Sequence, residues 1–458
     1  MSAQTSQSRS LRATATHVVR VLREAGFEAL WVGGCVRDFL LGREPGDYDI
    51  VTSARPEQVE KRFGRTIPVG RKFGVVVVVE GGHQFQVATF RSEADYRDGR
   101  HPEQVTFADA RADACRRDFT VNGLLYDPVG RTLCDWVGGQ ADLRGRTIRT
   151  IGPPGERFAE DYLRLLRAVR LAAQLEFEIE PATLAAIQAG AHAIKDISAE
   201  RIRDELVKLF RPPHAGRGLE LLRQSRLLEE VLPEIAATVS CGQSPDFHPE
   251  GTVFEHLRLM LERMPPEAAS ALPWAVLLHD VAKPVTASPD PEKGTIRFWG
   301  HERLGAEMAA GILERLRFPR RQSEDIVKAV RCHMQFKDAL QMRKSTLRRL
   351  LLRPTFALEL ELHRLDCLGS HGRLDTFEFL VAQAKALEDQ PHIRPPLLKG
   401  GDLLALGMKP GPPMGALLAE IREKQLQDDL KTPAQARRWA RRRIRESAAA
   451  GSAGGGGI

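Results

Sequence analysis

The sequence has few cysteines, and their spacing excludes the common cysteine-based scaffolds. Its 458 residues include six cysteines, and no two of them form a C-x-x-C pair. The sequence therefore predicts neither a zinc knuckle nor a disulfide framework. It also lacks any run close to the roughly 18 apolar residues of a membrane span, and its polar start, MSAQTSQSRS, has no secretory hydrophobic region. We therefore expect a cytoplasmic protein with no membrane partner.

A strong charge of either sign is absent as well. Lysine and arginine total 67 against 60 aspartate and glutamate, a formal net charge of +7. This modest basic excess is compatible with a polyanionic partner but does not require one. With 42% hydrophobic and 28% charged residues, the composition is that of a globular protein. The length predicts roughly three or four domains.

The secondary-structure signals change near residue 150. Before it, strand and helix signals mix, with strands expected over Val75–Glu80 and Gln84–Phe90 around a Gly81-Gly82 turn. Helical periodicity dominates from Glu156 onward. We expect an N-terminal helix with a disordered start over residues 1–24, an α/β head over 25–150, a helical neck over 151–245, a helical domain over 246–390, a helical tail over 391–446 and a disordered end over 447–458.

The stretch Trp31–Thr52 combines a glycine turn with a pair of carboxylates. It predicts an apolar strand, a Gly33-Gly34 turn, a short helix, and a second strand that carries Asp47 and Asp49. Because side chains alternate across a strand, the two carboxylates share a face and can share a divalent cation. The glycines allow close backbone approach and offer amide donors to phosphate, and the guanidinium of Arg37 matches phosphate geometry. These features predict a nucleoside-triphosphate site.

Two further motifs carry clustered arginines. RRDFTVN, residues 116–122, packs two guanidinium groups, a carboxylate and an amide around an apolar anchor, and such adjacent arginines usually face a phosphate or solvent. EDYLRLLRAVR, residues 160–170, is expected to place Asp161, Arg164, Arg167 and Arg170 in a polar band along one helix. Taken singly, the motifs also fit a charged surface turn and a helix-surface ion pair. The three arginines at three-residue spacing favour a site that faces a triphosphate or a base edge.

The motifs GGCVRDFLLG…DYD, RRDFTVN and EDYLRLLRAVR resemble, in order and spacing, those of class II tRNA nucleotidyltransferases and bacterial poly(A) polymerases. The segments IPVGRKFGVVVVV and VATFRSEADYRDGRHPEQVTF match that family's strand pair and flexible loop, and the resemblance covers residues 25–235. It implies an α/β nucleotidyltransferase (polymerase-β-like) head followed by an all-α neck. It also implies that the loop around Asp95–Arg100 reshapes the nucleotide pocket between CTP and ATP.

The resemblance also implies roles for individual residues. Asp47 and Asp49 would be catalytic and hold Mg²⁺, and Asp161 with Arg164 would recognise the incoming base without a template. The nucleotide-binding set would be Gly33, Gly34, Arg37, Arg117, Asp118, Asn122, Asp161, Arg164, Arg167 and Arg170. The enzyme would add CCA to tRNA 3′ ends from CTP and ATP, by two-metal in-line transfer that releases pyrophosphate. Cytosine and adenine both present an amino donor beside a ring-nitrogen acceptor, so one carboxylate and one guanidinium could read both bases.

One position departs from the family pattern. Members often carry a carboxylate in the strand where this chain has Gln86, in FQVATF. An amide cannot act as a base and is a weaker metal ligand. Asp47 and Asp49 could suffice without it, and Glu80 on the neighbouring strand is an alternative ligand.

The second half of the chain contains an ordered series of imidazoles and carboxylates. Its members are His256, His279, Asp280, His301, His333 and Asp366. These ligand types suit a divalent transition metal and activated water. The series resembles the HD phosphohydrolase domain over residues 250–370, which implies a metal-dependent phosphatase or phosphodiesterase site. The alternative is a scaffold retained without turnover.

The final segment contains a basic run. KGGDLLALGMKPGPPMGALLAEIREKQL resembles the tail domain that accompanies this HD-containing type. The following RRWARRRIR interleaves Trp439 with arginines, which suits an RNA backbone through charge and stacking. The expected RNA-binding residues are Arg437, Arg438, Arg441 and Arg442. A solvated amphipathic helix end is the alternative.

Three function classes follow from these observations. The first is a tRNA nucleotidyltransferase that adds CCA, with a poly(A) polymerase or an enzyme restricted to CC or to A as the alternative within the family. The second is an HD-type phosphohydrolase acting on RNA ends or nucleotides, whose head only binds them. The third, an RNA-binding scaffold, is least favoured, because binding alone needs no carboxylate pair beside a phosphate-binding turn.

Overall fold

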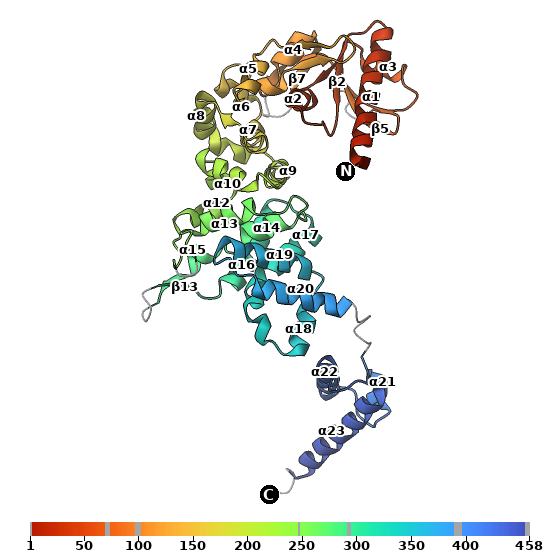
Figure 1. The fold of residues 1–458 in the computed structure, drawn as a ribbon, viewed down its shortest axis with the longest axis vertical. Coiled ribbons are helices and arrows are strands. Elements are labelled where there is room, and N and C mark those ends of the chain that lie inside the picture. Colours follow the sequence, from red (N-terminus) through yellow and green to blue (C-terminus); the bar gives the residue numbers. More distant parts are fainter. Residues whose placement is uncertain are drawn as a thin grey trace. The chain divides into compact units, whose positions relative to one another are not determined.

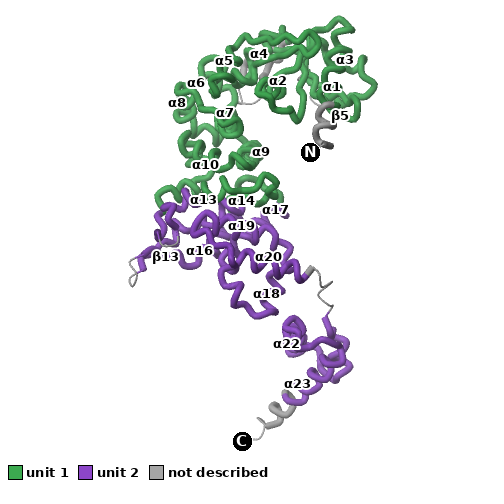
Figure 2. The backbone as a smooth tube through the Cα atoms, viewed as in Figure 1, with its two compact units in different colours: residues 1–241, 257–273, 311–319 green, residues 242–256, 274–310, 320–458 purple. Residues whose placement is uncertain are grey.

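The computed structural model describes residues 2–68, 74–96, 102–245, 248–290, 295–388 and 396–453. The chain divides into two compact units (Figure 2). Unit 1 comprises residues 1–241, 257–273 and 311–319, and unit 2 comprises residues 242–256, 274–310 and 320–458. None of the helices that the structure describes has the length and apolar character needed to span a bilayer.

The head of unit 1, which is coloured red to orange in Figure 1, contains a sheet. This sheet has seven strands in the order β3-β4-β5-β2-β1-β8-β9. Its strands are β1 (Ala29–Val32), β2 (Asp49–Thr52), β3 (Thr66–Ile67), β4 (Val75–Glu80), β5 (His83–Thr89), β8 (Leu125–Asp127) and β9 (Thr132–Cys134). Only β2 and β5 pair in parallel, and the other neighbours are antiparallel. A separate antiparallel hairpin is formed by β6 (Arg91–Tyr96) and β7 (Pro102–Phe107).

Apolar side chains cover both faces of the central strands. Leu30 and Val32 of β1 join a buried cluster with Val51 of β2, whereas Trp31 points to the opposite face, where its ring lies 4.7 Å from that of Tyr48. This alternation is the period of two expected of a strand. The helices of the head are α1 (Ser2–Glu24), α2 (Gly34–Leu40), α3 (Pro56–Glu60), α4 (Ala110–Cys115), α5 (Gly139–Arg144) and the 3₁₀ helix η2 (Thr120–Asn122).

Two sequence predictions about the head are confirmed. The stretch Trp31–Thr52 forms β1, α2 and β2 in the expected order. The strands β4 and β5 form an antiparallel hairpin, and Gly81 and Gly82 have φ values of +55° and +80°. A two-residue hairpin turn with two positive φ angles matches the twist of the flanking strands, and glycine adopts it without strain.

The rest of unit 1 is largely helical. A short parallel pair, β10 (Thr147–Ile148) and β11 (Glu178–Ile179), accompanies its helices. The helices are α6 (Pro154–Glu160), α7 (Leu163–Leu175), α8 (Pro181–Gly190), η3 (Ala191–Asp196), α9 (Ala199–Leu209), α10 (Ala215–Gln224), α11 (Leu228–Val231), α12 (Pro233–Ala236) and η4 (Ala237–Ser240).

From residue 242 onward the described chain is helical apart from the hairpin of β12 (Ala287–Pro289) and β13 (Ile296–Phe298). The helices up to residue 388 are α13 (Val253–Glu262), α14 (Leu272–Leu278), α15 (Lys283–Thr286), α16 (His301–Arg315), α17 (Arg320–Cys332), η5 (His333–Gln341), α18 (Lys344–Leu351), α19 (Phe356–Gly369) and α20 (Asp375–Glu388). The last helices are α21 (Gly400–Leu404), α22 (Pro412–Leu426) and α23 (Pro433–Ala453). Helix α23 continues past residue 446, where the sequence predicted a disordered end to begin.

Candidate functional site

The glycine turn after β1 brings an arginine to the start of α2. Gly33 has a φ of +77°, a conformation that side chains with a Cβ rarely adopt. A Cβ at this position would also lie only 3.3 Å from Nη1 of Arg117. The turn therefore needs glycine for its backbone and for space, and it places the Arg117 guanidinium beside the first residues of α2.

The two predicted metal ligands lie at the start of β2. Pairing of β1 with β2 puts Asp49 opposite Val32, the last residue before the glycine turn. Asp47 precedes β2, which begins at Asp49, so the pair spans the strand's start rather than lying within it as predicted. Burial and the nearby charge of Asp47 raise the pKa of Asp49 to about 6, against an opposing effect of Arg117.

The repulsion between the Asp47 and Asp49 carboxylates favours binding of a divalent cation. Two neighbouring carboxylates resist being ionised together, and a bound cation removes that repulsion. Carboxylate oxygens are also the ligands that Mg²⁺ prefers. The donor set of Asp47 and Asp49 therefore suits Mg²⁺.

Gln86 lies on the strand next to this pair. The parallel register of β2 and β5 matches Ile50 with Val87, so Asp49 and Gln86 stand at the same level on one face of the sheet. Glu80, the alternative ligand, pairs with His83 at the far end of the hairpin. The position beside Asp49 is thus an amide, and the nearest carboxylate of β4 is several residues away.

A hydrogen-bonded chain connects the three sequence motifs. Arg37 donates through Nη1 to Oδ1 of Asn122 at 2.7 Å, and Asn122 donates through Nδ2 to Oδ1 of Asp118 at 3.2 Å. Arg167 of α7 donates through Nε to Oδ2 of Asp118 at 2.9 Å. Burial favours the neutral acid, but the Arg167 guanidinium outweighs it and holds the pKa of Asp118 well below its usual range. Residues far apart in sequence are thereby fixed relative to one another.

The adjacent arginines of RRDFTVN share a carboxylate that sequence reasoning missed. Asp113 of α4 is fully buried and accepts from Arg116 at 2.7 Å and from Arg117 at 3.0 Å. The two guanidinium groups lower its pKa despite the burial. Both arginines are therefore paired with one carboxylate, and the i, i+3 and i, i+4 spacing from Asp113 was the signal for it.

Asp161 does not share a helix with the three arginines, which corrects the predicted polar band. It follows α6 in an extended conformation, and its Oδ1 accepts from the backbone N–H of Leu163 at 3.0 Å, where α7 begins. A short acidic side chain that bonds the backbone two residues on ends one helix and starts the next. Its Oδ2 accepts from Arg201 at 2.7 Å.

The arginines of α7 each meet a different partner. Arg164 is buried and is bound by the carboxylate of Glu160 and by the carbonyl of Arg157 at 2.9 Å. Arg170 donates through Nε to Glu205 at 2.6 Å. The structure thus brings Arg37, Asn122, Asp118 and Arg167 together, and places Asp161, Arg164 and Arg170 in separate ion pairs.

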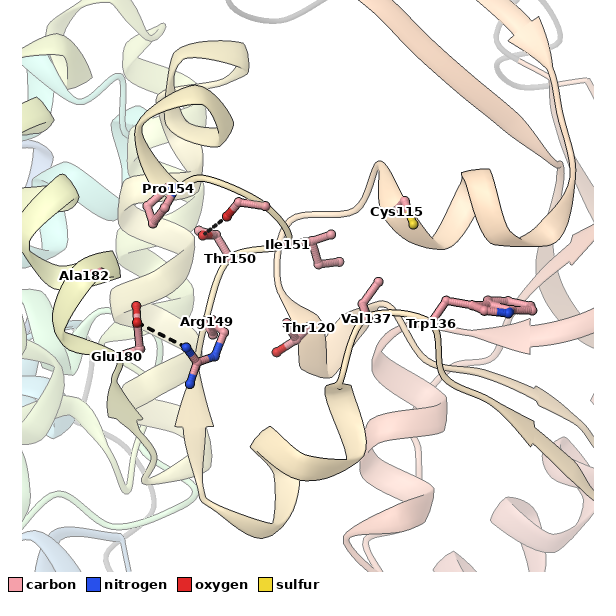
Figure 3. Close-up of a pocket in the computed structure, with 11 residues that line it drawn as sticks. Cys115, Thr120, Trp136, Val137, Arg149, Thr150, Ile151, Pro154, Glu180 and Ala182 are labelled. Atoms are coloured by element: carbon pink, nitrogen blue, oxygen red, sulfur yellow. Dashed lines mark hydrogen bonds and ion pairs between the residues drawn. The ribbon is translucent and has the colours of Figure 1, made fainter.

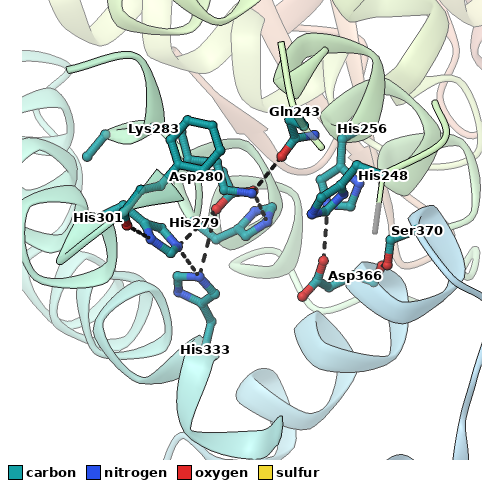
Figure 4. Close-up of polar contacts among 12 residues, drawn as sticks. Gln243, His248, His256, His279, Asp280, Lys283, His301, His333, Asp366 and Ser370 are labelled. Carbon is teal, nitrogen blue, oxygen red and sulfur yellow. Dashed lines mark hydrogen bonds and ion pairs between the residues drawn. The ribbon is translucent and has the colours of Figure 1, made fainter. Parts of the chain in front are cut away.

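The imidazoles of the second half converge in unit 2 (Figure 4). Nδ1 of His279, His301 and His333 lies 2.8, 2.8 and 2.6 Å from the carbonyl oxygens of Val276, Phe298 and Val330, respectively. A carbonyl only accepts, so each Nδ1 carries a proton, and in the neutral form of such a ring the lone pair lies on Nε2. Burial lowers the pKa of His333 to about 3, which keeps that ring neutral.

These lone pairs point at one another around Asp280. Nε2 of His301 lies 3.1 Å from Nε2 of His333 and 3.4 Å from Oδ1 of Asp280. Nε2 of His279 is buried without a hydrogen-bond partner among the described residues, 3.1 Å from Oδ2 of Asp280. Acceptors facing acceptors repel unless a cation lies between them, so these residues fit a divalent transition metal.

The remaining members of the series form the adjoining part of the cluster. His256 is fully buried, and its Nε2 lies 3.1 Å from Oδ1 of Asp366. Burial opposes the charged ring, but hydrogen bonds to Asp366 and Glu250 raise the pKa of His256 to about 9. A cavity of about 950 Å³ opens beside these groups, and its lining includes Asp280, His301, His333 and Asp366. All six predicted HD residues therefore lie in one place.

A smaller cavity of about 410 Å³ lies in unit 1 (Figure 3). Its lining includes Cys115 of α4, Trp136 and Pro154, and Arg149 pairs with Glu180 at its edge at 3.2 Å. None of the residues predicted for the nucleotide site is among those that line it.

Three family models match the chain. They are a poly A polymerase head domain over residues 29–149, a probable RNA- and SrmB-binding site of polymerase A over residues 176–238, and an HD domain over residues 251–359. A CCA-adding enzyme of Streptococcus suis is 32% identical over 426 residues, which cover 92% of this chain and 93% of that enzyme. The chain belongs to the family of CCA-adding enzymes.

Other members of the CCA-adding family match a shorter region more strongly. The enzyme of Geobacillus kaustophilus is 46% identical over 228 residues, and that of Lactobacillus helveticus is 44% identical over 220 residues. The chain spans only 56% and 55% of these two relatives, respectively. The solved CCA-adding enzyme of Bacillus stearothermophilus in complex with CTP has a TM-score of 0.74 and 27% identity, covering 95% of this chain and 98% of its own. The predicted family and fold class are confirmed.

The tail arginines of this CCA-adding family member differ in their contacts. Arg437 pairs with Asp402 at 3.3 Å, and Arg442 pairs with Glu446 at 3.6 Å. Arg438 and Arg441 are exposed and make no ion pair with any side chain that the structure describes. Trp439 packs against the apolar core of the tail, which corrects the expectation that it is interleaved for stacking on RNA.

Some polar partners in both sites were not predicted from the sequence. They are Asp113, Glu160, Arg201 and Glu205 in unit 1, and Gln243, His248, Glu250 and Lys283 in unit 2. Lys283 follows its partner Asp280 by three residues, and that spacing was available as a signal. The predicted loop at Asp95–Arg100 lies largely outside the described residues, which omit 97–101.

The raised pKa of Asp49 predicts a pH dependence of metal use. A carboxyl group with a pKa of about 6 is protonated below that pH and then no longer offers an anionic ligand. The apparent affinity for Mg²⁺ in nucleotide incorporation should therefore fall about tenfold per pH unit below about pH 6. Mg²⁺ titrations of CTP incorporation at several pH values measure this. An apparent Mg²⁺ affinity that stays constant between pH 7 and pH 5 would contradict the role of the Asp49 carboxylate.

Proposed function

We propose that this protein is a template-independent tRNA nucleotidyltransferase of the cytoplasm that adds CCA to tRNA 3′ ends from CTP and ATP. The observation that carries the proposal is the Asp47–Asp49 pair beside the Gly33 turn, with two guanidinium groups at the same turn. That arrangement occurs in a chain whose relatives over nearly its full length are CCA-adding enzymes. The tRNA 3′ end, CTP and ATP are the proposed partners.

Each part of the head has a task in this mechanism. Arg37 and Arg117 bind the triphosphate through charge-assisted hydrogen bonds. Asn122 and Asp118 orient Arg37 and Arg167, so the guanidinium groups need little reorganisation when the nucleotide enters. Mg²⁺ held by Asp47 and Asp49 would neutralise charge on the attacking and leaving oxygens during in-line transfer. The 3′-hydroxyl of the RNA attacks the α-phosphate, and pyrophosphate leaves.

We assign recognition of the incoming nucleotide's base to Asp161 and Arg164. The carboxylate of Asp161 is fixed by Arg201 and by the Leu163 amide, and the guanidinium of Arg164 is fixed by Glu160. Side chains held by such partners keep one geometry, which a site that rejects guanine and uracil needs. Arg170, in the middle of α7, pairs with Glu205 of α9 and so holds the two helices together.

Arg164→Ala should relax base choice more than it lowers total turnover. Losing a charged hydrogen bond to the base edge costs about 1.5–3 kcal/mol, so discrimination of CTP from UTP should fall about 10- to 100-fold. Single-nucleotide incorporation rates with each of the four nucleotides measure this, with the exposed Arg144→Ala as the matched control. An equal loss for all four nucleotides would assign Arg164 to the phosphates instead.

The function itself is tested with tRNA transcripts that lack the whole CCA end, lack only the final adenosine, or are complete. Each is incubated with Mg²⁺ and with CTP and ATP, singly and together. Two additions with CTP, one further addition with ATP and then a stop are the expected result. A long ladder with ATP alone would make the protein a poly(A) polymerase, and addition confined to one nucleotide would make it a CC- or A-adding enzyme. No extension would contradict the proposal.

The exposed tail arginines are proposed to contact the RNA backbone. Arg438 and Arg441 are three residues apart on α23 and so lie on one side of it. Their guanidinium groups are not neutralised by any described carboxylate, unlike those of Arg437 and Arg442. Phosphate contacts of this kind add affinity without sequence preference.

A second activity, metal-dependent hydrolysis of phosphoesters, is proposed for unit 2. The observation that favours it is the convergence of imidazole lone pairs around Asp280 beside a cavity of about 950 Å³. His256, His279, His301, His333, Asp280 and Asp366 would hold the metal, which would supply an activated water at neutral pH. RNA ends and nucleotides are the proposed substrates. If a hydrolysis assay finds no turnover, unit 2 is a scaffold and this second activity is rejected.

A further inference from the structure

A carboxylate outside the predicted HD series holds two of the imidazoles of unit 2. Oε1 of Glu250 lies 2.7 Å from Nδ1 of His256 and 2.9 Å from Nδ1 of His248. The side chains of Glu250 and His256 are 6% and 0% exposed. The buried carboxylate oxygen accepts a hydrogen bond from both rings, so each imidazole carries a proton on Nδ1 and directs Nε2 away from Glu250.

The local sequence accounts for this placement. In the segment His248–Gly251, the N–H of Gly251 donates to the carbonyl of His248 at 3.2 Å, which closes a turn with Pro249 and Glu250 at its centre. Gly251 has a φ of +102°, a conformation that favours glycine. Thr252 follows, and its hydroxyl accepts from the N–H of Glu255 at 3.2 Å at the start of α13. The turn thus folds Glu250 back toward the helix that carries His256.

His256 differs from the other imidazoles of the site in the kind of group that orients its ring. His279, His301 and His333 are oriented by backbone carbonyls three residues earlier, and that support follows from the backbone alone. His256 is oriented by a side chain, so its orientation depends on one residue that can be replaced. Glu250 therefore has a role that substitution can isolate.

We propose that Glu250 is the positioning residue of the metal centre in unit 2: it holds His256 with Nε2 directed at Asp366, and it holds His248 at the wall of the adjoining cavity. This inference rests on the proposed phosphohydrolase function, because it assigns a support to one ligand of that metal. A carboxylate bound to the far nitrogen of a ligating imidazole fixes the ring and makes it a stronger ligand. His248 lines the cavity, so the same carboxylate orients a ligand and a residue that faces the bound molecule.

The test compares the unaltered protein with Glu250→Ala and Glu250→Gln. Mn²⁺ is the probe, and its binding is followed by electron paramagnetic resonance of the full-length chain. Glu250→Ala should weaken Mn²⁺ binding about 10- to 100-fold, as is usual for an outer-shell partner of a ligating histidine. Glu250→Gln should be intermediate, because its amide oxygen still accepts a hydrogen bond without the negative charge. Glu361→Ala is the matched control, since it removes a carboxylate from α19, the helix that carries Asp366.

A second measurement needs no metal. In protein labelled with ¹⁵N-histidine, the Nδ1 protons that Glu250 holds should give slowly exchanging, downfield imidazole signals, and His248→Gln assigns one of them. Glu250→Ala should lose both signals while the backbone spectrum of unit 2 is retained. If this variant binds Mn²⁺ as tightly as the unaltered protein and keeps both signals, the inference is overturned although the metal centre stands. If the unaltered protein binds no Mn²⁺ beyond that which Asp49→Asn in the head removes, the metal centre of unit 2 itself is overturned.

Discussion

Asp49→Asn is expected to lower the incorporation of both CTP and ATP by at least about 10³-fold. A metal ligand at the reacting phosphate contributes several kcal/mol of transition-state stabilisation, and each 1.36 kcal/mol is a factor of ten in rate. The amide keeps the shape of the side chain but loses its charge. Binding of tRNA, measured separately by filter binding or anisotropy, should be retained, since the substitution removes no RNA contact. Single-turnover incorporation with each nucleotide measures the loss.

The thermal stability of Asp49→Asn shows whether a loss of incorporation comes from lost catalysis or from unfolding. The pKa of Asp49 is raised from 3.8 to about 6 in the folded protein, so the stability that it costs develops between these two pH values and is fully present above about pH 6. Removing the charge should therefore leave the melting temperature at neutral pH equal or higher. Glu80→Gln on β4 is the matched control and should keep its activity, because Glu80 lies at the far end of the hairpin from Gln86. Normal incorporation by Asp49→Asn would reject the metal assignment.

Asp280→Ala is expected to abolish divalent-metal binding in unit 2 and to destabilise it by about 3–5 kcal/mol. Asp280 is buried, and its Oδ2 lies 2.7 Å from Nζ of Lys283, whose side chain is only 8% exposed. Removing the carboxylate leaves a buried ammonium group without its anionic partner, which costs more than the pair itself contributes. Urea denaturation measures the free energy of unfolding, and Mn²⁺ binding measures the metal centre.

The double variant Asp280→Ala/Lys283→Met separates the two effects. Replacing both members of a buried ion pair by apolar side chains is often neutral for stability. The double variant should therefore recover stability without recovering Mn²⁺ binding. Incorporation of CTP and ATP should be unchanged in both variants, because the proposed nucleotide site lies in unit 1. If the single variant binds Mn²⁺ as before, Asp280 is not a ligand.

Much of the local structure of the head was predictable because it depends on neighbours in sequence. The turn at Gly33 and the hairpin at Gly81 and Gly82 need positive φ angles, and glycine signals them directly. Helix ends were harder to predict. Asp161 was expected on a helix because its spacing to Arg164 is helical, but its side chain bonds the Leu163 amide and ends α6 instead. Helical periodicity does not reveal whether an aspartate side chain bonds to the nearby backbone and ends the helix.

The sequence alone determined which chemical groups are present and in what order. The carboxylate pair after a glycine turn, the arginine motifs and the ordered histidines indicate phosphate and metal chemistry by residue type and spacing. Only the tertiary structure decided which of these groups are partners. Asp118 meets Arg167 across 49 residues and His256 meets Asp366 across 110. Glu250 acquires its role through the turn that brings its carboxylate to His256. The physical reason is that residue type and spacing act locally, whereas pairing in a buried, low-dielectric setting depends on how distant segments pack.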